Sequence, residues 1–182
     1  MLMPARSLAR FGPFAILAAF CLPASVIRAQ ANQSKLDDPT IVAIFDAANT
    51  FDMETGALAA TRARSKDVHE FGEMLVHDHG MVRQQGRDLA ASLKVTPTTP
   101  REFALATAHT AAMKKLSPLK GAAFDRAFLQ QEIDFHNAVI DAITTTLLPA
   151  IQNAQLKDLV TKVAPAFGAH RDRAQNLLDH LK

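Results

Sequence analysis

The sequence has no tryptophan, no tyrosine and a single cysteine, Cys21. The absence of tyrosine excludes tyrosyl-radical chemistry, and the absence of both residues removes most of the aromatic side chains that stack on nucleic-acid bases. Cys21 lies in an apolar segment near the N-terminus. If that segment is removed, the remaining chain has neither a disulfide nor a thiolate metal ligand, and its stability must come from a packed apolar core.

The N-terminal 31 residues have the pattern of a secretory signal peptide. Arg6 and Arg10 precede the apolar run 11–22, and Ala29-Gln30-Ala31 supplies a small-residue cleavage pattern. We therefore expect residues 1–31 to be a signal peptide and residues 32–182 to be an exported domain, periplasmic or associated with the outer membrane, without an integral membrane span. An uncleaved membrane anchor is the alternative reading of the same segment.

The positive charge of the chain belongs to this leader. Residues 1–31 contain three of the 20 Lys and Arg residues and none of the 18 acids, which leaves 17 basic residues against 18 acidic ones. Nucleic-acid binding needs a basic face, so the mature domain is not expected to bind DNA or RNA.

Strand signals are nearly absent, and helical periodicity continues through the mature chain. Four long helices are predicted, at about 39–63, 65–93, 122–148 and 154–181. Asp38 is the expected N-cap of the first. A shorter connector helix is expected after a T-x-x-E capping box at Thr99–Glu102 and should end near Leu116. This order predicts an all-α, ferritin-like four-helix bundle with a long crossover that carries the connector helix between helices 2 and 3.

Three histidines lie on the apolar seams of three different helices: His79, His136 and His170. His77 is about 200° away from His79 around the helix and should face solvent instead. Burying three imidazoles without partners would cost several kcal/mol, which a shared metal ion or a shared polar network would avoid. A metal site, a metal-free network and unrelated core histidines all remain open.

The candidate metal ligands are Glu54 from the first helix together with His79, His136 and His170. Glu132, one turn before His136, and Asp78, at the edge of the seam, are candidates for a further ligand or for a supporting position. This nitrogen-rich, carboxylate-containing set suits Zn, Fe or Cu. No acid stands three residues before any histidine, so the Glu-x-x-His pattern of di-iron bundles is missing.

Three segments resemble blocks of the domain-of-unknown-function 4142 family of bacterial proteins. They are Met74–His79 (M-V-x-D-H), Leu116–Phe128 (L-x-x-x-x-G-x-x-F-D-x-x-Y) and Ala164–His170 (L-P-x-L-x-x-H). The second D-H pair of the family appears here as Phe135-His136. The resemblance covers about residues 39–181 and implies an exported ferritin-like bundle without an established reaction, often described as an outer-membrane protein.

These observations favour an exported bundle that binds a transition metal through inward His and Glu side chains. The alternative is a non-catalytic envelope or stress-related protein with an internal histidine network and no metal. No nucleophile motif or phosphate-binding glycine loop is present, so the sequence does not favour an enzyme. Asp125 and Arg126, near the start of the third helix, are expected to serve the helix dipole and a salt bridge to the connector.

Overall fold

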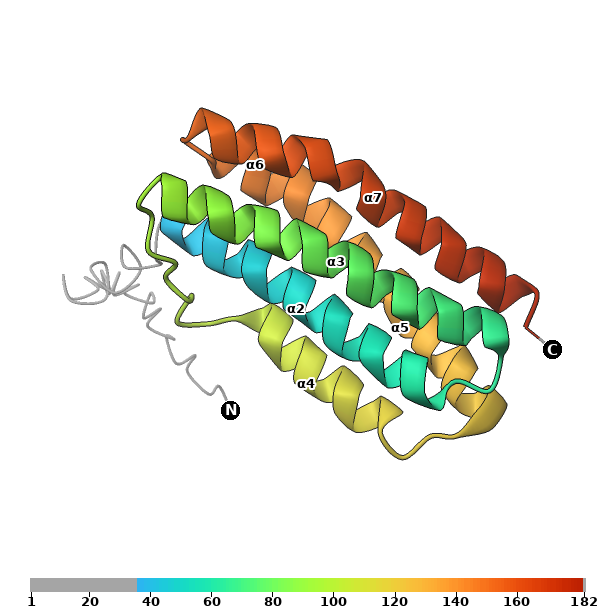
Figure 1. The fold of residues 1–182 in the computed structure, drawn as a ribbon. Coiled ribbons are helices and arrows are strands. Elements are labelled where there is room, and N and C mark those ends of the chain that lie inside the picture. The colour runs from blue at the N-terminus through green and yellow to red at the C-terminus, as the bar shows by residue number, and fades with distance from the viewer. Residues whose placement is uncertain (1–35, 182) are drawn as a thin grey trace, which may run out of the picture. The chain divides into compact units, whose positions relative to one another are not determined.

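The computed structural model describes residues 36–181, and their regular structure is helical throughout (Figure 1). The elements are α2 (Asp38–Arg62), α3 (Lys66–Ser92), α4 (Ala104–Leu116), α5 (Gly121–Ala142), the π-helix η1 (Ile143–Leu147), α6 (Leu148–Ala150) and α7 (Ala154–Asp179). No strand occurs in this part of the chain. The predicted signal peptide, residues 1–31, lies outside the described residues, and its removal stays a prediction.

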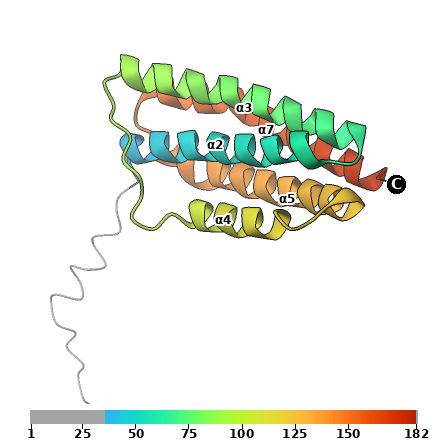
Figure 2. The same ribbon diagram turned by 60° about the horizontal axis from the view of Figure 1, so that its bottom comes forward.

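The four long helices form two antiparallel pairs, α2 with α3 and α5 with α7 (Figure 1). The connection from α3 to α5 runs the length of the bundle and carries α4, which contacts α2 and α5 (Figure 2). The predicted all-α bundle with a crossover between its second and third long helices is confirmed. None of the helices in residues 36–181 has both the length and the apolar character that a bilayer span requires.

The start of α2 differs from the prediction by one residue. Asp37, rather than Asp38, is the N-cap, and its Oδ1 accepts a hydrogen bond of 3.0 Å from the Thr40 amide. The Asp38 carboxylate instead accepts from the amides of Gln152 and Asn153 at 2.9 and 2.8 Å. It therefore ties the start of α2 to the start of α7.

Two further helix ends depart from the sequence prediction. The expected capping box at Thr99 does not form, and α4 begins at Ala104 after an N-cap, Phe103, that makes no side-chain cap. The third long helix is α-helical only to Ala142, and residues 143–147 wind as a π-helix. A π-turn inserts one residue into the helical repeat and changes which side chains face inward.

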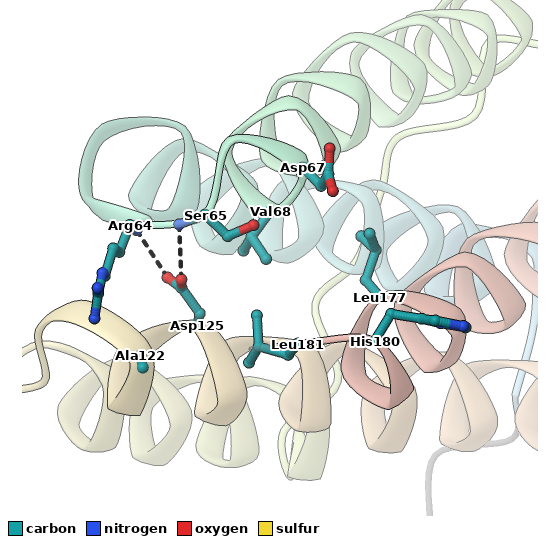
Figure 3. A pocket seen from close by; sticks show the side chains of 9 residues that line it. All are labelled: Arg64, Ser65, Asp67, Val68, Ala122, Asp125, Leu177, His180 and Leu181. Atoms are coloured by element: carbon teal, nitrogen blue, oxygen red, sulfur yellow. Dashed lines mark hydrogen bonds between the residues drawn. The ribbon is translucent and has the colours of Figure 1, made fainter.

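Asp125 caps a neighbouring helix instead of pairing with the connector. Its buried carboxylate accepts from the amides of Arg64 at 3.0 Å and Ser65 at 2.8 Å, where α3 begins (Figure 3). The first amides of a helix lack partners within the helix, and a carboxylate there also meets the positive end of the helix dipole. Asp125 is therefore structural, as expected, but it acts on the junction between α2 and α3.

Two glycines let α2 and α3 approach closely. A Cβ atom on Gly72 would lie 2.6 Å from the Gly56 carbonyl oxygen, and one on Gly56 would lie 2.8 Å from the Gly72 oxygen. No larger residue fits at either position without moving a backbone. This contact lies one turn beyond Asp52 on α2 and helps to fix the spacing of the two helices at the level of the buried polar residues.

The core consists of two apolar clusters separated by a polar layer. The first cluster centres on Phe45, Val139 and Phe167, and the second on Phe71 and Phe128. Between them, each of the four long helices contributes buried polar side chains, which are Asn49, Asp52, Thr55, His79, Glu132, His136 and His170. A concentration of polar groups in the middle of an apolar core needs a chemical explanation.

Candidate metal centre

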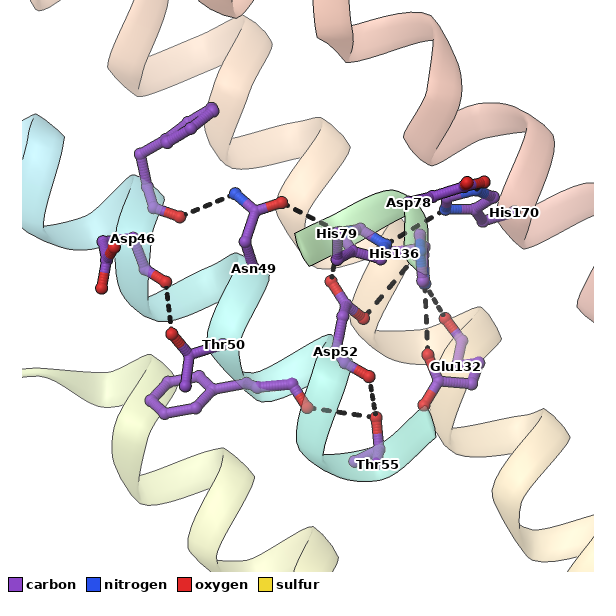
Figure 4. A network of polar contacts seen from close by, with 12 residues as sticks. Asp46, Asn49, Thr50, Asp52, Thr55, Asp78, His79, Glu132, His136 and His170 are labelled. Carbon is purple, nitrogen blue, oxygen red and sulfur yellow. Dashed lines mark hydrogen bonds and ion pairs between the residues drawn. The ribbon is translucent and has the colours of Figure 1, made fainter. Parts of the chain in front are cut away.

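The three predicted histidines meet in the polar layer (Figure 4). His79 comes from α3, His136 from α5 and His170 from α7, and all three are buried. Their ring centroids are 5.7 Å (His79–His136), 4.9 Å (His79–His170) and 5.6 Å (His136–His170) apart. One ring nitrogen of each lies within 4.8 Å of a nitrogen of the other two. The sequence-based prediction that these imidazoles share one place in the bundle is confirmed.

A fixed acceptor determines which nitrogen of His79 carries the proton. Its Nδ1 lies 2.9 Å from Oδ1 of Asn49. The orientation of the Asn49 amide is not free, because its NH2 group donates to the Phe45 carbonyl at 2.8 Å. An amide oxygen only accepts, so the His79 proton belongs on Nδ1 and the lone pair on Nε2.

The other two histidines are held in the same way. His136 Nδ1 lies 2.8 Å from the backbone oxygen of Glu132, which places its proton on Nδ1. His170 Nε2 lies 3.1 Å from Oδ2 of Asp78, which places a proton on Nε2. Burial alone would raise the pKa of Asp78, but hydrogen bonds from His77 and His170 lower it below its ordinary value. Asp78 is therefore an ionised acceptor, and it supports His170 as the sequence suggested.

These proton positions leave three lone pairs on the inner side of the cluster, at His79 Nε2, His136 Nε2 and His170 Nδ1. His79 Nε2 and His170 Nδ1 are 3.1 Å apart, and neither carries a proton in this assignment. Two nitrogens bound at about 2.1 Å to one ion lie roughly 3.0–3.4 Å apart. Imidazole ligands of metal sites characteristically donate their outer N–H to an acceptor that fixes the ring, as all three do here.

Two buried carboxylates complete the cluster. Asp52 on α2 and Glu132 on α5 are each 1% exposed. Asp52 Oδ1 lies 3.9 Å from His136 Nε2, Asp52 Oδ2 lies 3.5 Å from His79 Nδ1, and Glu132 Oε2 lies 3.6 Å from His136 Nδ1. Asp52, Glu132 and His136 form a second group with ligand atoms within 4.8 Å of one another. The carboxylates therefore adjoin the histidine group.

Unsatisfied polar atoms gather at this one place. Within residues 36–181, the buried side-chain nitrogens and oxygens without a hydrogen-bond partner are both carboxylate oxygens of Asp52, Glu132 Oε2 and His136 Nε2. Each such atom costs about 1–3 kcal/mol when it is left unpaired. Four such atoms from three adjoining side chains, Asp52, Glu132 and His136, form an arrangement that a bound cation would satisfy.

The pKa values in the cluster are strongly displaced from ordinary values. Burial, with smaller contributions from His136 and His170, lowers the pKa of His79 to about 2, and burial lowers that of His136 to about 4. Burial raises the pKa of Glu132 to about 7 against the opposing effects of Thr55 and Asp52. Burial and the nearby charge of Glu132 raise the pKa of Asp52 well above its usual range. Without a cation, the site therefore disfavours charge of either sign.

Glu54 does not belong to the cluster, and its prediction as a ligand alongside the three histidines is wrong. Its side chain is half exposed, and Oε2 lies 2.7 Å from His109 Nε2 on α4. His109 is buried and stacks on Phe51 with ring centroids 4.2 Å apart. This contact attaches α4 to the outer side of α2, and the acid that α2 contributes to the cluster is Asp52.

The inward position of Asp52 could be read from the sequence of α2, although the largest apolar residues of this helix lie on another face. The buried line of α2 runs through Phe45, Ala48, Asp52 and Ala59. Larger apolar residues such as Phe51 lie off this line, because the Phe51 ring faces Phe103 and His109 at α4. Because α2 is covered on two sides, its apolar residues do not mark a single inward face. The alternation of small and polar residues on the true line was the available clue.

Outer residues of the central D-H motif take supporting positions. His77 is exposed, as predicted, and its Nδ1 lies 2.9 Å from Asp78 Oδ1. Asp78, one third exposed, therefore links an outward histidine to the buried His170. Glu73, one turn before His77, pairs with His69, whose Nε2 lies 3.3 Å from Glu73 Oε1.

Comparison with known proteins identifies the family of this chain. Neither the curated proteins nor the solved structures contain a match. The family model described as "Domain of unknown function (DUF4142)" matches residues 24–177, a range that contains every residue of the candidate metal centre. The chain therefore belongs to the DUF4142 family.

Proposed function

We propose that the protein binds one divalent transition-metal ion in the polar layer of the bundle. The single observation that carries the proposal is the convergence of unprotonated ring nitrogens and unpartnered carboxylate oxygens at one buried place. His79 Nε2, His136 Nε2 and His170 Nδ1 would bind the ion, with Asp52 Oδ1 as a fourth donor. Glu132 would supply a further donor or balance the charge from the adjoining position.

Charge balance supports a divalent ion. Two ionised carboxylates, Asp52 and Glu132, neutralise one dication, whereas the three imidazoles bind as neutral ligands. A buried centre of zero net charge avoids the large penalty for an uncompensated charge in a low-dielectric interior. Three imidazoles favour Zn, Fe or Cu over Mg and Ca, which prefer oxygen ligands.

The competing reading is a metal-free histidine network. An additional proton between His79 Nε2 and His170 Nδ1 would satisfy that contact. Protons on Asp52 and Glu132, which the raised pKa values of both groups favour, would have to serve the remaining atoms, but Asp52 Oδ1 lies 3.9 Å from His136 Nε2, too far for a hydrogen bond. A cation accounts for all of these atoms together, so the observations favour the metal-binding function.

The proposal is tested by the metal content of purified protein after equilibration with Zn²⁺, Fe²⁺ or Cu²⁺ and removal of excess ion. Wild-type protein should retain about one ion per chain, and the double variant His79→Ala, His136→Ala should retain almost none. The matched control is His69→Ala, His180→Ala, which removes two imidazoles that lie outside the core. Equal metal content in the two double variants would eliminate the proposal.

We also propose that the protein acts after export, in the periplasm or at the outer membrane, where it would handle metal ions of the cell envelope. The signal-peptide pattern in residues 1–31 supports this location. N-terminal sequencing of protein recovered from the envelope tests it. A chain that starts near Asn32 is expected, and a chain that retains the leader would support the membrane-anchor alternative.

A further inference from the structure

An apolar cavity of about 230 Å³ lies next to the candidate metal centre. Its walls come from α2, α5, the π-helix and α7, with residues from the loop before α2 and from α4 at its margin. Five of the lining residues bear on what the cavity can bind, namely Ala48, Asn49, Ala142, Thr146 and Phe167. Of these residues, Asn49 and Phe167 also contact His79, so they lie between the cavity and the metal centre.

The walls of this cavity select against charge. Among residues 36–181, no charged side chain lines it, and Asn49 and Thr146 are the only lining residues there with polar side chains. A charged ligand would lose its hydration without gaining a partner, which is strongly unfavourable. Apolar cavities of roughly 150 Å³ stay dry and bind benzene or xenon, so this cavity has room for a molecule of about that size.

Two lining residues connect the cavity directly to the histidine cluster. Asn49 accepts from His79 Nδ1 through its oxygen and donates one N–H to the Phe45 carbonyl. The Phe167 ring packs against the rings of His79 and His136, with centroid distances of 5.2 and 5.9 Å. A molecule in the cavity would thus touch the residues that orient and pack two of the proposed ligands.

The π-helix forms part of the cavity wall. Ile143, Thr146 and Leu147 all belong to η1 and all line the cavity. The inserted residue of a π-turn alters the spacing of side chains along one face of a helix, and such turns occur frequently at functional sites. The π-helix therefore lies directly beside the cavity.

We infer that this cavity is a binding site for a small, uncharged, predominantly apolar molecule. Binding itself depends only on the cavity. The statement that the ligand sits beside a metal ion rests on the proposed function. The ligand class is set by the absence of charge among the described lining residues and by the volume.

Benzene serves as the probe, and thermal unfolding of purified, metal-free protein gives the first measurement. At a benzene concentration of about ten times its dissociation constant, Tm should rise by about 3–6 °C. Ala142→Leu fills the cavity from a half-buried position and should abolish the rise. Ala123→Leu makes the same change on an exposed part of α5 outside the cavity and should preserve it.

Three results would overturn the inference. They are no rise in Tm for the wild type, an undiminished rise in Ala142→Leu, or crystals of the wild type under xenon pressure without xenon density between Asn49 and Phe167. The xenon measurement uses only the wild type, so it still tests the inference if the Ala142→Leu variant fails to fold. A cavity filled by N-terminal residues or by a second copy of the chain would give the first and third results.

A second measurement separates this inference from the proposed metal site. Co²⁺-loaded protein should show a shift in its visible absorption bands when benzene saturates the cavity, because Asn49 and Phe167 contact the ligand imidazoles. If the protein holds no metal but benzene still raises Tm, the proposed function fails and the cavity site stands. If metal is bound and benzene has no effect on Tm, the cavity site fails alone.

Discussion

Raising the pH from 6.5 to 7.5 should destabilise the metal-free protein and leave the metal-loaded protein nearly unchanged. The pKa of Glu132 in the folded protein is about 7 against an ordinary value of 4.5, and that of Asp52 is also raised well above its ordinary value. At a pH between the ordinary pKa and the folded-state pKa of either group, the folded protein holds a proton that the unfolded chain has released. The stability contributed by both groups is complete below their ordinary pKa values and is lost as the pH rises through their folded-state pKa values.

The histidines act in the opposite direction and at lower pH. The pKa values of His79 and His136 fall to about 2 and about 4, from 6.5. Lowered pKa values of bases destabilise the folded protein in acid, and this effect is absent well above pH 6.5, the ordinary value. At pH 6.5 each ring is still about half protonated in the unfolded chain, so the two histidines together offset about 0.7 kcal/mol of the carboxyl effect between pH 6.5 and 7.5. The carboxyl groups contribute more, about 2 kcal/mol, and therefore set the sign of the pH dependence.

The expected size follows from the number of raised carboxyl groups. Each group that stays protonated only in the folded state lowers the free energy of unfolding by about 1.4 kcal/mol for each pH unit. Asp52 gives about 1.4 kcal/mol over one unit, and Glu132, half titrated on average between pH 6.5 and 7.5, gives about 0.7 kcal/mol. After the opposing contribution of the histidines the net loss is about 1–1.5 kcal/mol, or about 2–6 °C in Tm for a domain of this length. In the metal-loaded protein both carboxylates are already ionised, so this loss should disappear.

Urea unfolding of metal-free and metal-loaded protein at the two pH values provides the measurement. The double variant Asp52→Asn, Glu132→Gln is the control, because amides of the same shape cannot titrate, and its metal-free form should lose most of the slope. A metal-free wild type whose stability rises with pH would refute the electrostatic account of the cluster. The electrostatic account would also be refuted if the unfolding free energies of metal-free wild type and of the control variant changed equally with pH.

Other predictions concern the fold and the ligand assignment. Gly72→Ala should lower the free energy of unfolding by at least about 1–3 kcal/mol in urea, because its Cβ would meet the Gly56 backbone oxygen at 2.6 Å. Asp125→Ala should cost about 2–3 kcal/mol in the same assay, because two amides at the start of α3 lose their acceptor. Metal titration should give the wild-type stoichiometry for Glu54→Gln and an affinity at least about tenfold weaker for Asp52→Asn, whereas equal affinities would contradict the assignment of Asp52.

Much of the fold follows from the spacing of apolar residues. The seams of α3, α5 and α7 alternate steps of three and four residues, and each carries one histidine, so their convergence was predictable from periodicity alone. Helix ends were less predictable. The Thr99 capping box has the correct residue types, but the loop that contains it leads into α4 only at Ala104. The π-turn at 143–147 has no sequence signal that separates it from a regular α-helix.

The site was predictable on three helices and not on the fourth. An isolated amphipathic face identifies an inward residue, as for His79 and Glu132, but α2 packs against α4 on its outer side as well as against the core. Phe51 therefore looked like a core residue and shifted the predicted face toward Glu54. The supporting role of Asn49 depends on the orientation of its amide toward Phe45, which only three-dimensional contacts define.

Anomalous X-ray diffraction from crystals of the Zn²⁺-loaded protein, measured on both sides of the zinc absorption edge, tests the central claim most directly. One peak is expected at about 2.0–2.2 Å from His79 Nε2, His136 Nε2, His170 Nδ1 and Asp52 Oδ1. Zinc peaks confined to exposed residues, with the three inward nitrogens bonded only to one another or to water, would contradict the account.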